Sequence, residues 1–168
     1  MNYSNKNQVP NLFQRIISVW YRHIRVYTSN LISNAFPPFL EPLIMLAGLG
    51  IGLGALISDV GGMSFILFLA SGLIVTSAMF TSAYECTYGT FIRLDYDGVY
   101  DGMLSAPLSA EDLVIGEILF VGTKGFFFSF AVLAVVWAAS VINYPLSIIT
   151  VFIGFITGIM FGTVSMFI

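Results

Sequence analysis

The sequence has little of what metal, redox and nucleic-acid sites are made from. Cys86 is its only cysteine and His23 its only histidine, so one chain can form neither an internal disulfide nor a zinc site of cysteine and histidine ligands. Six of the 168 residues are Lys or Arg and nine are Asp or Glu, which gives a net charge of −3. Such a chain has no basic stripe for a phosphate backbone, and nucleic acid is not an expected partner.

Charge of either sign is scarce, whereas apolar residues form long runs. Charged residues make up 9% of the chain and hydrophobic residues 58%, with a mean hydropathy of +0.93. In soluble domains about a quarter of the residues are charged. Four runs are long enough to cross a hydrocarbon layer of about 30 Å: residues 36–57, 65–84, 118–142 and 146–168. The sequence predicts one all-α, polytopic integral membrane domain over residues 1–168.

Residues 12–33, before the first run, have a helical amphipathic pattern. Apolar side chains recur at steps of three and four on one side, at Phe13, Ile16, Ile17, Trp20, Ile24, Tyr27 and Leu31. This pattern predicts a helix that lies in the membrane interface, with Trp20 toward the acyl chains. The alternative is an amphipathic helix packed on protein.

The basic residues predict the orientation of the chain. Lys6, Arg15, Arg22 and Arg25 precede the first span, which places the amino terminus in the cytoplasm of a bacterial inner membrane by the positive-inside rule. Counting spans then places residues 85–117 in the cytoplasm. No polar segment follows the last run, so we expect the sequence to be truncated or a fragment.

Residues 85–117 carry seven of the nine carboxylates: Glu85, Asp95, Asp97, Asp101, Glu111, Asp112 and Glu117. Ser109, three residues before Asp112, predicts a helix start. Upstream, Tyr100, Met103 and Leu104 fall on one side of a short amphipathic helix. Asp97 and Asp101 share another side. We expect this helix to lie in the cytoplasm.

Two functions compete for the carboxylates of this helix. In the first, Asp95, Asp97 and Asp101 bind a divalent ion for phosphoryl chemistry on a lipid. The second is docking into a cleft on a soluble partner. Residues 95–98 are too short for an EF-hand loop, and the phosphatidyltransferase signature is absent. The docking interpretation is therefore favoured, with no metal.

Ionisable residues also occur within or beside the spans. Lys124 is either an anchor that reaches the interface or the partner of a carboxylate such as Glu41 or Glu85. Glu41 follows Pro37 and Pro38, and the first helix is expected to become regular only beyond it.

Glycines are spaced at intervals of four in two spans. Gly48 and Gly52 in the first span, and Gly154 and Gly158 in the last, predict close helix packing. A mobile hinge is the alternative.

Three stretches together resemble the permease subunits of ABC-2 type exporters. They are FLEPL at residues 39–43, ECTYGTF at residues 85–91, and YDGMLSAPLS at residues 100–109 with the later Gly116 and Glu117. The likeness is to the nodulation-type branch, which exports lipo-chitooligosaccharides and has relatives that move drugs and polysaccharide precursors.

The resemblance implies an amphipathic amino-terminal helix, six spans, of which this chain has four, and a cytoplasmic coupling helix between the second and third. Residues 100–104 fall at that helix. In the family a permease dimer works with separate ATP-binding subunits, which bind ATP and magnesium. The resemblance therefore implies a transport subunit that is not an enzyme, with no catalytic residue or cofactor of its own.

We expect Tyr100, Met103 and Leu104 to fill an apolar cleft on the ATP-binding partner. Asp97, Asp101 and Pro107 would border it, and Glu41, Glu85, Arg93 and Lys124 are the structural or pathway charges. The main rival is a non-transporting membrane anchor or scaffold. A channel is disfavoured because no regular ring of polar residues would line a pore.

Overall fold

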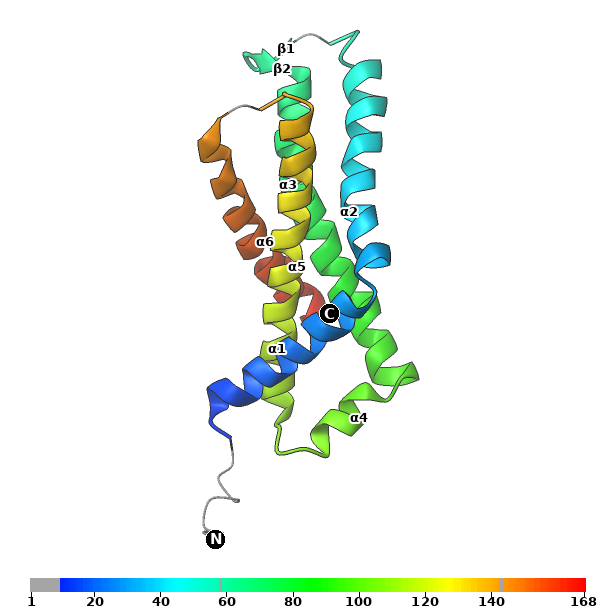
Figure 1. The fold of residues 1–168 in the computed structure, drawn as a ribbon, viewed down its shortest axis with the longest axis vertical. Coiled ribbons are helices and arrows are strands. Elements are labelled where there is room, and N and C mark those ends of the chain that lie inside the picture. The colour runs from blue at the N-terminus through cyan, green and yellow to red at the C-terminus, as the bar shows by residue number, and fades with distance from the viewer. Residues whose placement is uncertain (1–9, 58, 143) are drawn as a thin grey trace.

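The computed structural model describes residues 10–57, 59–142 and 144–168, and Figure 1 shows a bundle of long helices crossed near one end by a shorter one. The turns η1 to η3 are π-helical and η4 is a 3-10 helix. The elements are α1 (Leu12–Ser29), α2 (Leu31–Met45), η1 (Leu46–Ile51), β1 (Asp59–Val60), β2 (Met63–Ser64), α3 (Phe65–Tyr84), η2 (Glu85–Gly89), η3 (Ile92–Tyr96), α4 (Val99–Leu104), α5 (Ala110–Ala138), η4 (Pro145–Ile148) and α6 (Ile149–Phe167).

Four helical segments are long and apolar enough to cross a membrane, which confirms the predicted all-α polytopic fold. They are Ile32–Ile51, Phe65–Tyr96, Ala110–Ala138 and Pro145–Phe167. A short hairpin, β1–β2, joins the first two spans and was not predicted; its turn residues Gly61 and Gly62 have φ of 61° and 84°. Glycine suits such a turn because it adopts positive φ at little cost.

The second and third spans continue past the limits predicted from hydropathy. The helix from Phe65 runs through η2 and η3 to Tyr96, and α5 starts at Ala110. Much of the polar insert at residues 85–117 is thus helix continuous with the spans. Hydropathy does not show this because charged side chains that pair with one another still count as polar.

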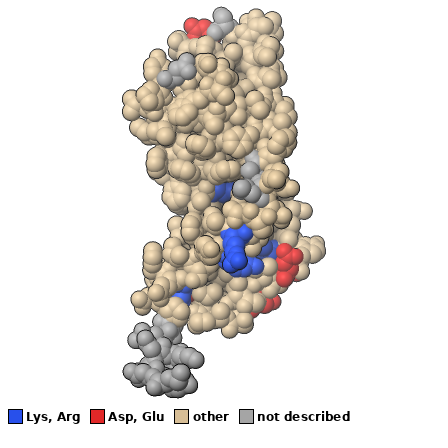
Figure 2. Space-filling model, in the orientation of Figure 1, with Lys and Arg blue, Asp and Glu red and all other residues tan. Residues whose placement is uncertain are grey.

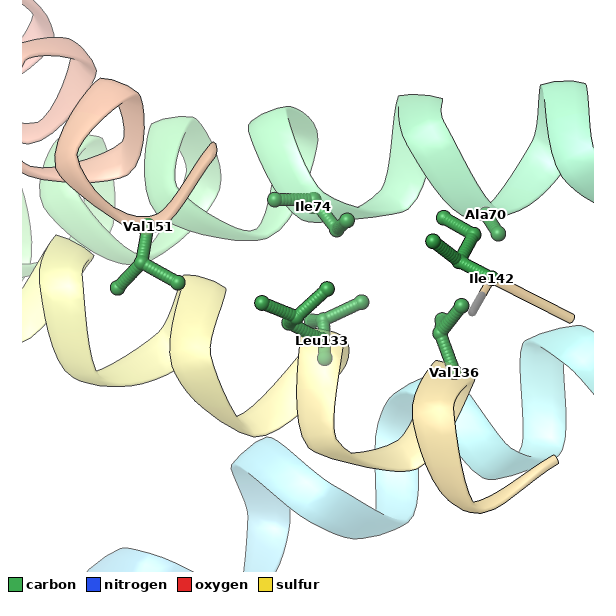
Figure 3. Packing of buried hydrophobic residues seen from close by; sticks show 7 residues of the cluster. Ala70, Ile74, Leu133, Val136, Ile142 and Val151 are labelled. Carbon is green, nitrogen blue, oxygen red and sulfur yellow. The ribbon is translucent and has the colours of Figure 1, made fainter. Parts of the chain in front are cut away.

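The main core lies between α3, α5 and α6. Figure 3 shows Ala70 and Ile74 of α3 facing Leu133 and Val136 of α5, with Val151 of α6 beside them. All five side chains are buried. Apolar contact alone does not favour helix association in lipid, so close fit must hold these helices together.

The close fit between α5 and α6 depends on glycine. A Cβ atom on Gly154 would overlap the hydroxyl of Ser129, and one on Gly158 would lie 3.2 Å from the Cα atom of Gly122. In contrast, no described atom lies within 4 Å of the Cβ position at Gly48 or Gly52. Gly154 and Gly158 therefore pack within the chain, and the packing predicted for the other pair is not seen there.

The helix α2 is regular from Leu31 despite three internal prolines, which differs from the expected start beyond Glu41. Pro38 has no N–H group to bond the carbonyl of Asn34 four residues earlier. The hydroxyl of Tyr27 in α1 donates to that carbonyl at 2.9 Å, and the Asn34 amide donates back to the Tyr27 carbonyl at 2.6 Å. A contact from another helix thus satisfies the group that proline leaves free.

One face of α1 packs across α5. Val19 lies against Gly116, the Trp20 indole donates to the Thr123 hydroxyl at 3.0 Å, and His23 stacks on Phe120 at 5.2 Å. The expectation that Trp20 faces the acyl chains is therefore wrong. The indole N–H finds an acceptor on α5 that lipid tails do not offer. Phe13 and Tyr21 are exposed instead.

Candidate functional site

The candidate site begins at α4, the short helix between the second and third spans. Gly98, with φ of 56°, precedes it in a conformation that other residues adopt at a cost. A loop then leads to α5, where the Ser109 hydroxyl accepts from the Asp112 N–H at 3.3 Å. The Asp112 carboxylate accepts from the Ser109 N–H at 2.8 Å. This reciprocal pair confirms the helix start predicted at Ser109.

The six residues predicted to meet a partner do not share one surface. Asp97, Asp101 and Pro107 are exposed, and Leu104 is 44% exposed. Met103 is half-buried, and Tyr100 is only 8% exposed because its ring packs between α1 and α5. The prediction that Tyr100 fills a cleft on a partner is therefore wrong. Its ring packs against Val19 and Leu113 of its own chain.

The Tyr100 hydroxyl joins α4 to a buried charge network. It donates to the Glu117 carboxylate on α5, which also pairs with the Arg93 guanidinium on η3. The Thr90 hydroxyl donates to the same carboxylate at 2.9 Å. Burial and the hydrogen bond to Glu117 raise the pKa of Tyr100 well above its usual range, so its phenol remains a protonated donor.

Arg93 connects this carboxylate to a second one. Its other terminal nitrogen lies 2.7 Å from Glu85, and the Lys124 ammonium lies 2.5 Å from the second oxygen of Glu85. Lys124 therefore pairs with Glu85, one of its two predicted partners. The other, Glu41, is exposed and has no ion pair within the described part of the chain.

The π-helical turns place Glu85 and Arg93 on one face. Eight residues rotate an α-helix about 80° beyond two full turns, whereas the wider π turns η2 and η3 take up part of this excess. Gly89 lies between them, and a Cβ atom there would be 2.9 Å from a Glu85 carboxylate oxygen. A side chain at position 89 would displace the ion pair.

The four charges of this network compensate one another. The side chains of Glu85, Arg93, Glu117 and Lys124 are between 2% and 18% exposed. Removal of one partner of a buried ion pair typically costs about 3–5 kcal/mol, since it leaves a charge uncompensated. The network therefore fixes α4, η2, η3 and α5 relative to one another.

Three of the four charges in the network were predicted as site residues, whereas Glu117 was not. Glu117 and Lys124 are seven residues apart, so they lie on the same face of a helix. Two charges on one face of a membrane span are costly unless other charges meet them. That spacing was the available signal.

The carboxylates of the alternative metal hypothesis do not converge. Asp95, Asp97 and Asp101 are all exposed, and no group of three metal-ligating residues occurs within the described residues.

Comparison with known proteins gives relatives of one kind. The chain is 40% identical over 114 residues to nodulation protein J of Azorhizobium caulinodans, and the aligned region covers 68% of this chain and 42% of that protein. It is 33% identical over 159 residues to nodulation protein J of Neorhizobium galegae, which covers 94% of this chain and 60% of that protein. The predicted resemblance to nodulation-type permeases is confirmed.

The chain thus spans about two fifths to three fifths of the length of these curated relatives. No family model matches it, and no solved structure matches it.

Proposed function

We propose that this chain, which is similar to nodulation protein J over as much as 94% of its length, acts as the membrane-spanning subunit of an ABC-2 type exporter. A separate ATP-binding subunit binds ATP and magnesium and supplies the energy. The exported molecule is amphiphilic, of the glycolipid or drug type. The similarity along nearly the whole chain is the observation that carries this proposal.

The proposed docking surface for the ATP-binding subunit is the outer side of α4. Leu104 is exposed at the carboxyl end of α4, Asp101 is exposed beside it, and Pro107 is exposed in the loop that follows. An apolar side chain with a charged rim is the usual arrangement at such contacts. Tyr100 has no place in this surface because it is buried.

The buried network gives a route by which movement of α4 reaches the spans. Tyr100 on α4 and Arg93 on η3 both bind the carboxylate of Glu117 on α5. The tilt of α4 against a partner would therefore pull on the second and third spans together. Buried networks of this kind transmit movement because few alternative arrangements satisfy all their groups.

The same proposal includes a permease homodimer in the bacterial inner membrane. The amino terminus and α4 would face the cytoplasm, where the ATP-binding subunit is found. Three of the four basic residues that precede the first span, Arg15, Arg22 and Arg25, are on α1, which lies near the same end of the bundle as α4 (Figure 1).

The test is copurification with a candidate ATP-binding-cassette protein. Leu104→Asp should reduce the copurified ATP-binding protein at least about tenfold, because the exposed apolar side chain that the contact would bury is lost. Export of a fluorescent amphiphile from vesicles should fall in parallel. Met63→Asp in the hairpin at the opposite end is the matched control, since Met63 is similarly exposed, at 42%.

Undiminished copurification and export by Leu104→Asp would contradict the assigned surface. A complex that assembles normally but exports nothing would instead support the anchor or scaffold hypothesis.

A further inference from the structure

A cavity of about 440 Å³ opens where α1 crosses the bundle. Its walls come from α1, the start of α2, the π turns η2 and η3, the first residue of α4, and α5. A volume of this size is within the range of small-molecule sites. Residues of the charge network form part of its wall, whereas the exposed residues Asp101, Leu104 and Pro107 do not line it.

Five charged residues line the cavity: Arg22, Asp97, Glu85, Arg93 and Lys124. The last three are paired with one another or with Glu117. Arg22 and Asp97 have no ion pair with any residue that the structure describes. The cavity thus has one uncompensated positive and one uncompensated negative side chain, on different elements.

Other titratable groups in the wall add no charge at neutral pH. Burial lowers the pKa of His23 to about 4, and burial raises the pKa of Tyr27 to about 12. Both side chains are therefore uncharged near pH 7. Asn30 is also in the wall and adds an uncharged amide.

The cavity lies at the level where the apolar surface of the molecule ends. Figure 2 shows Lys and Arg atoms gathered in the lower part of this face with Asp and Glu atoms beside them. Above them is a broad band almost without charge. Val26, Ile92 and Val99 line the cavity as well and give it an apolar edge. In a membrane this level corresponds to the lipid head groups.

We propose that this cavity binds a zwitterionic phosphoester of the phosphoethanolamine class. Arg22 binds the phosphate and Asp97 accepts hydrogen bonds from the ammonium group. A guanidinium and a carboxylate form strong, charge-assisted hydrogen bonds with these two groups. A head group with only negative charge would leave Asp97 unmatched and would meet Glu85 in the same wall.

The ligand can be a membrane lipid or a soluble molecule with the same head group. For the lipid, the purified full chain is placed in mixed micelles that contain equal amounts of phosphatidylethanolamine, phosphatidylglycerol and phosphatidylcholine. Native mass spectrometry then measures how much of each lipid stays bound to the protein. We expect retention of phosphatidylethanolamine several-fold above the other two. Isothermal titration with glycerophosphoethanolamine measures the soluble form. Heat on titration identifies the free head group as a sufficient ligand, and its absence with retained lipid assigns the site to lipid.

Substitutions locate the site. Arg22→Gln and Asp97→Asn should each lower retention of phosphatidylethanolamine about tenfold, the order expected for loss of one charged hydrogen bond. Arg25→Gln and Asp95→Asn are matched controls, since both residues are exposed and neither lines the cavity. Circular dichroism confirms folding, and Arg22→Lys should restore part of the binding if Arg22→Gln does not fold.

Equal retention of the three lipids by the unmodified chain, together with no heat from the soluble compound, would overturn the proposal. Equal losses in the control variants would do the same. The assay contains no ATP-binding subunit, so its failure is distinct from failure of the transport proposal.

Discussion

At the scale of single residues, Arg93 decides how the second and third spans are joined. Its guanidinium binds Glu85 through one terminal nitrogen and Glu117 through the other. A planar fork of donors can bind two carboxylates at once, whereas a lysine ammonium is a single point of charge. Tyr100 completes the coordination of Glu117 from α4. The position of α4 is therefore held by this phenolic hydroxyl and guanidinium as well as by the packing of the Tyr100 ring on Val19 and Leu113.

Tyr100→Phe removes that hydroxyl and keeps the ring packed on Val19 and Leu113. We expect a loss of stability of about 1–3 kcal/mol, because a carboxylate loses a hydrogen bond in a buried site. Hydrogen exchange should become faster in α4, and the melting temperature should fall. Tyr96→Phe is the control, since Tyr96 is 75% exposed. The same exchange rates in α4 for both variants would contradict the role given to Tyr100.

The buried His23 predicts a dependence of stability on pH. Burial lowers its pKa from 6.5 to about 4, so the unfolded chain binds a proton more readily than the folded one. Stability is complete above pH 6.5 and is lost as pH falls toward 4. At pH 5 the loss should be at most about 2 kcal/mol. His23→Gln should flatten the melting temperature between pH 7 and pH 5, and an unchanged slope would count against this assignment.

At the scale of elements, two contacts between helices allow sequences that would otherwise be unfavourable in a span. The helix α2 contains three prolines, and Tyr27 of α1 satisfies the carbonyl that Pro38 leaves free. The contact of α5 with α6 depends on glycines in both helices. In each case a contact with a second helix stabilises a sequence that would be unfavourable in an isolated span, as is usual within membranes.

Alanine substitutions separate the two glycine pairs. Gly154→Ala should destabilise the protein by about 1–3 kcal/mol, since its Cβ atom overlaps the Ser129 hydroxyl that bonds the Ile74 carbonyl. Gly48→Ala should be neutral or stabilising by up to about 1 kcal/mol, because its Cβ atom meets nothing within 4 Å. Thermal unfolding in detergent measures both. Equal losses would indicate that Gly48 packs on something outside the described residues.

At the scale of the whole molecule, most of the charge lies toward the ends of the bundle, and Glu41 within α2 is an exposed exception. Asp59 is in the hairpin at one end, and the other end carries α1, α4 and the buried network. The surface between them is largely uncharged (Figure 2). Such a distribution suits a chain that crosses a bilayer, since charge is costly in hydrocarbon.

The proposed orientation predicts which end reacts with a reagent that cannot cross membranes. Leu104→Cys should be labelled by an impermeant maleimide from the cytoplasmic side, and Met63→Cys from the opposite side. Cys86 is 3% exposed and should add little background. Labelling of position 104 from outside would reverse the topology and remove the proposed contact with an ATP-binding subunit.

The sequence alone determined the number of spans, their approximate places and the helix start at Ser109. These depend on local properties, because about 20 apolar residues are enough to span a hydrocarbon layer and a helix cap involves residues only three apart. The tertiary structure decided which charges pair, that Tyr100 faces inward, and that Trp20 faces α5 rather than lipid. Those outcomes depend on the rotation of each helix about its axis, which the π turns and contacts between distant helices set. A hydropathy average over a span does not depend on that rotation and so cannot predict it.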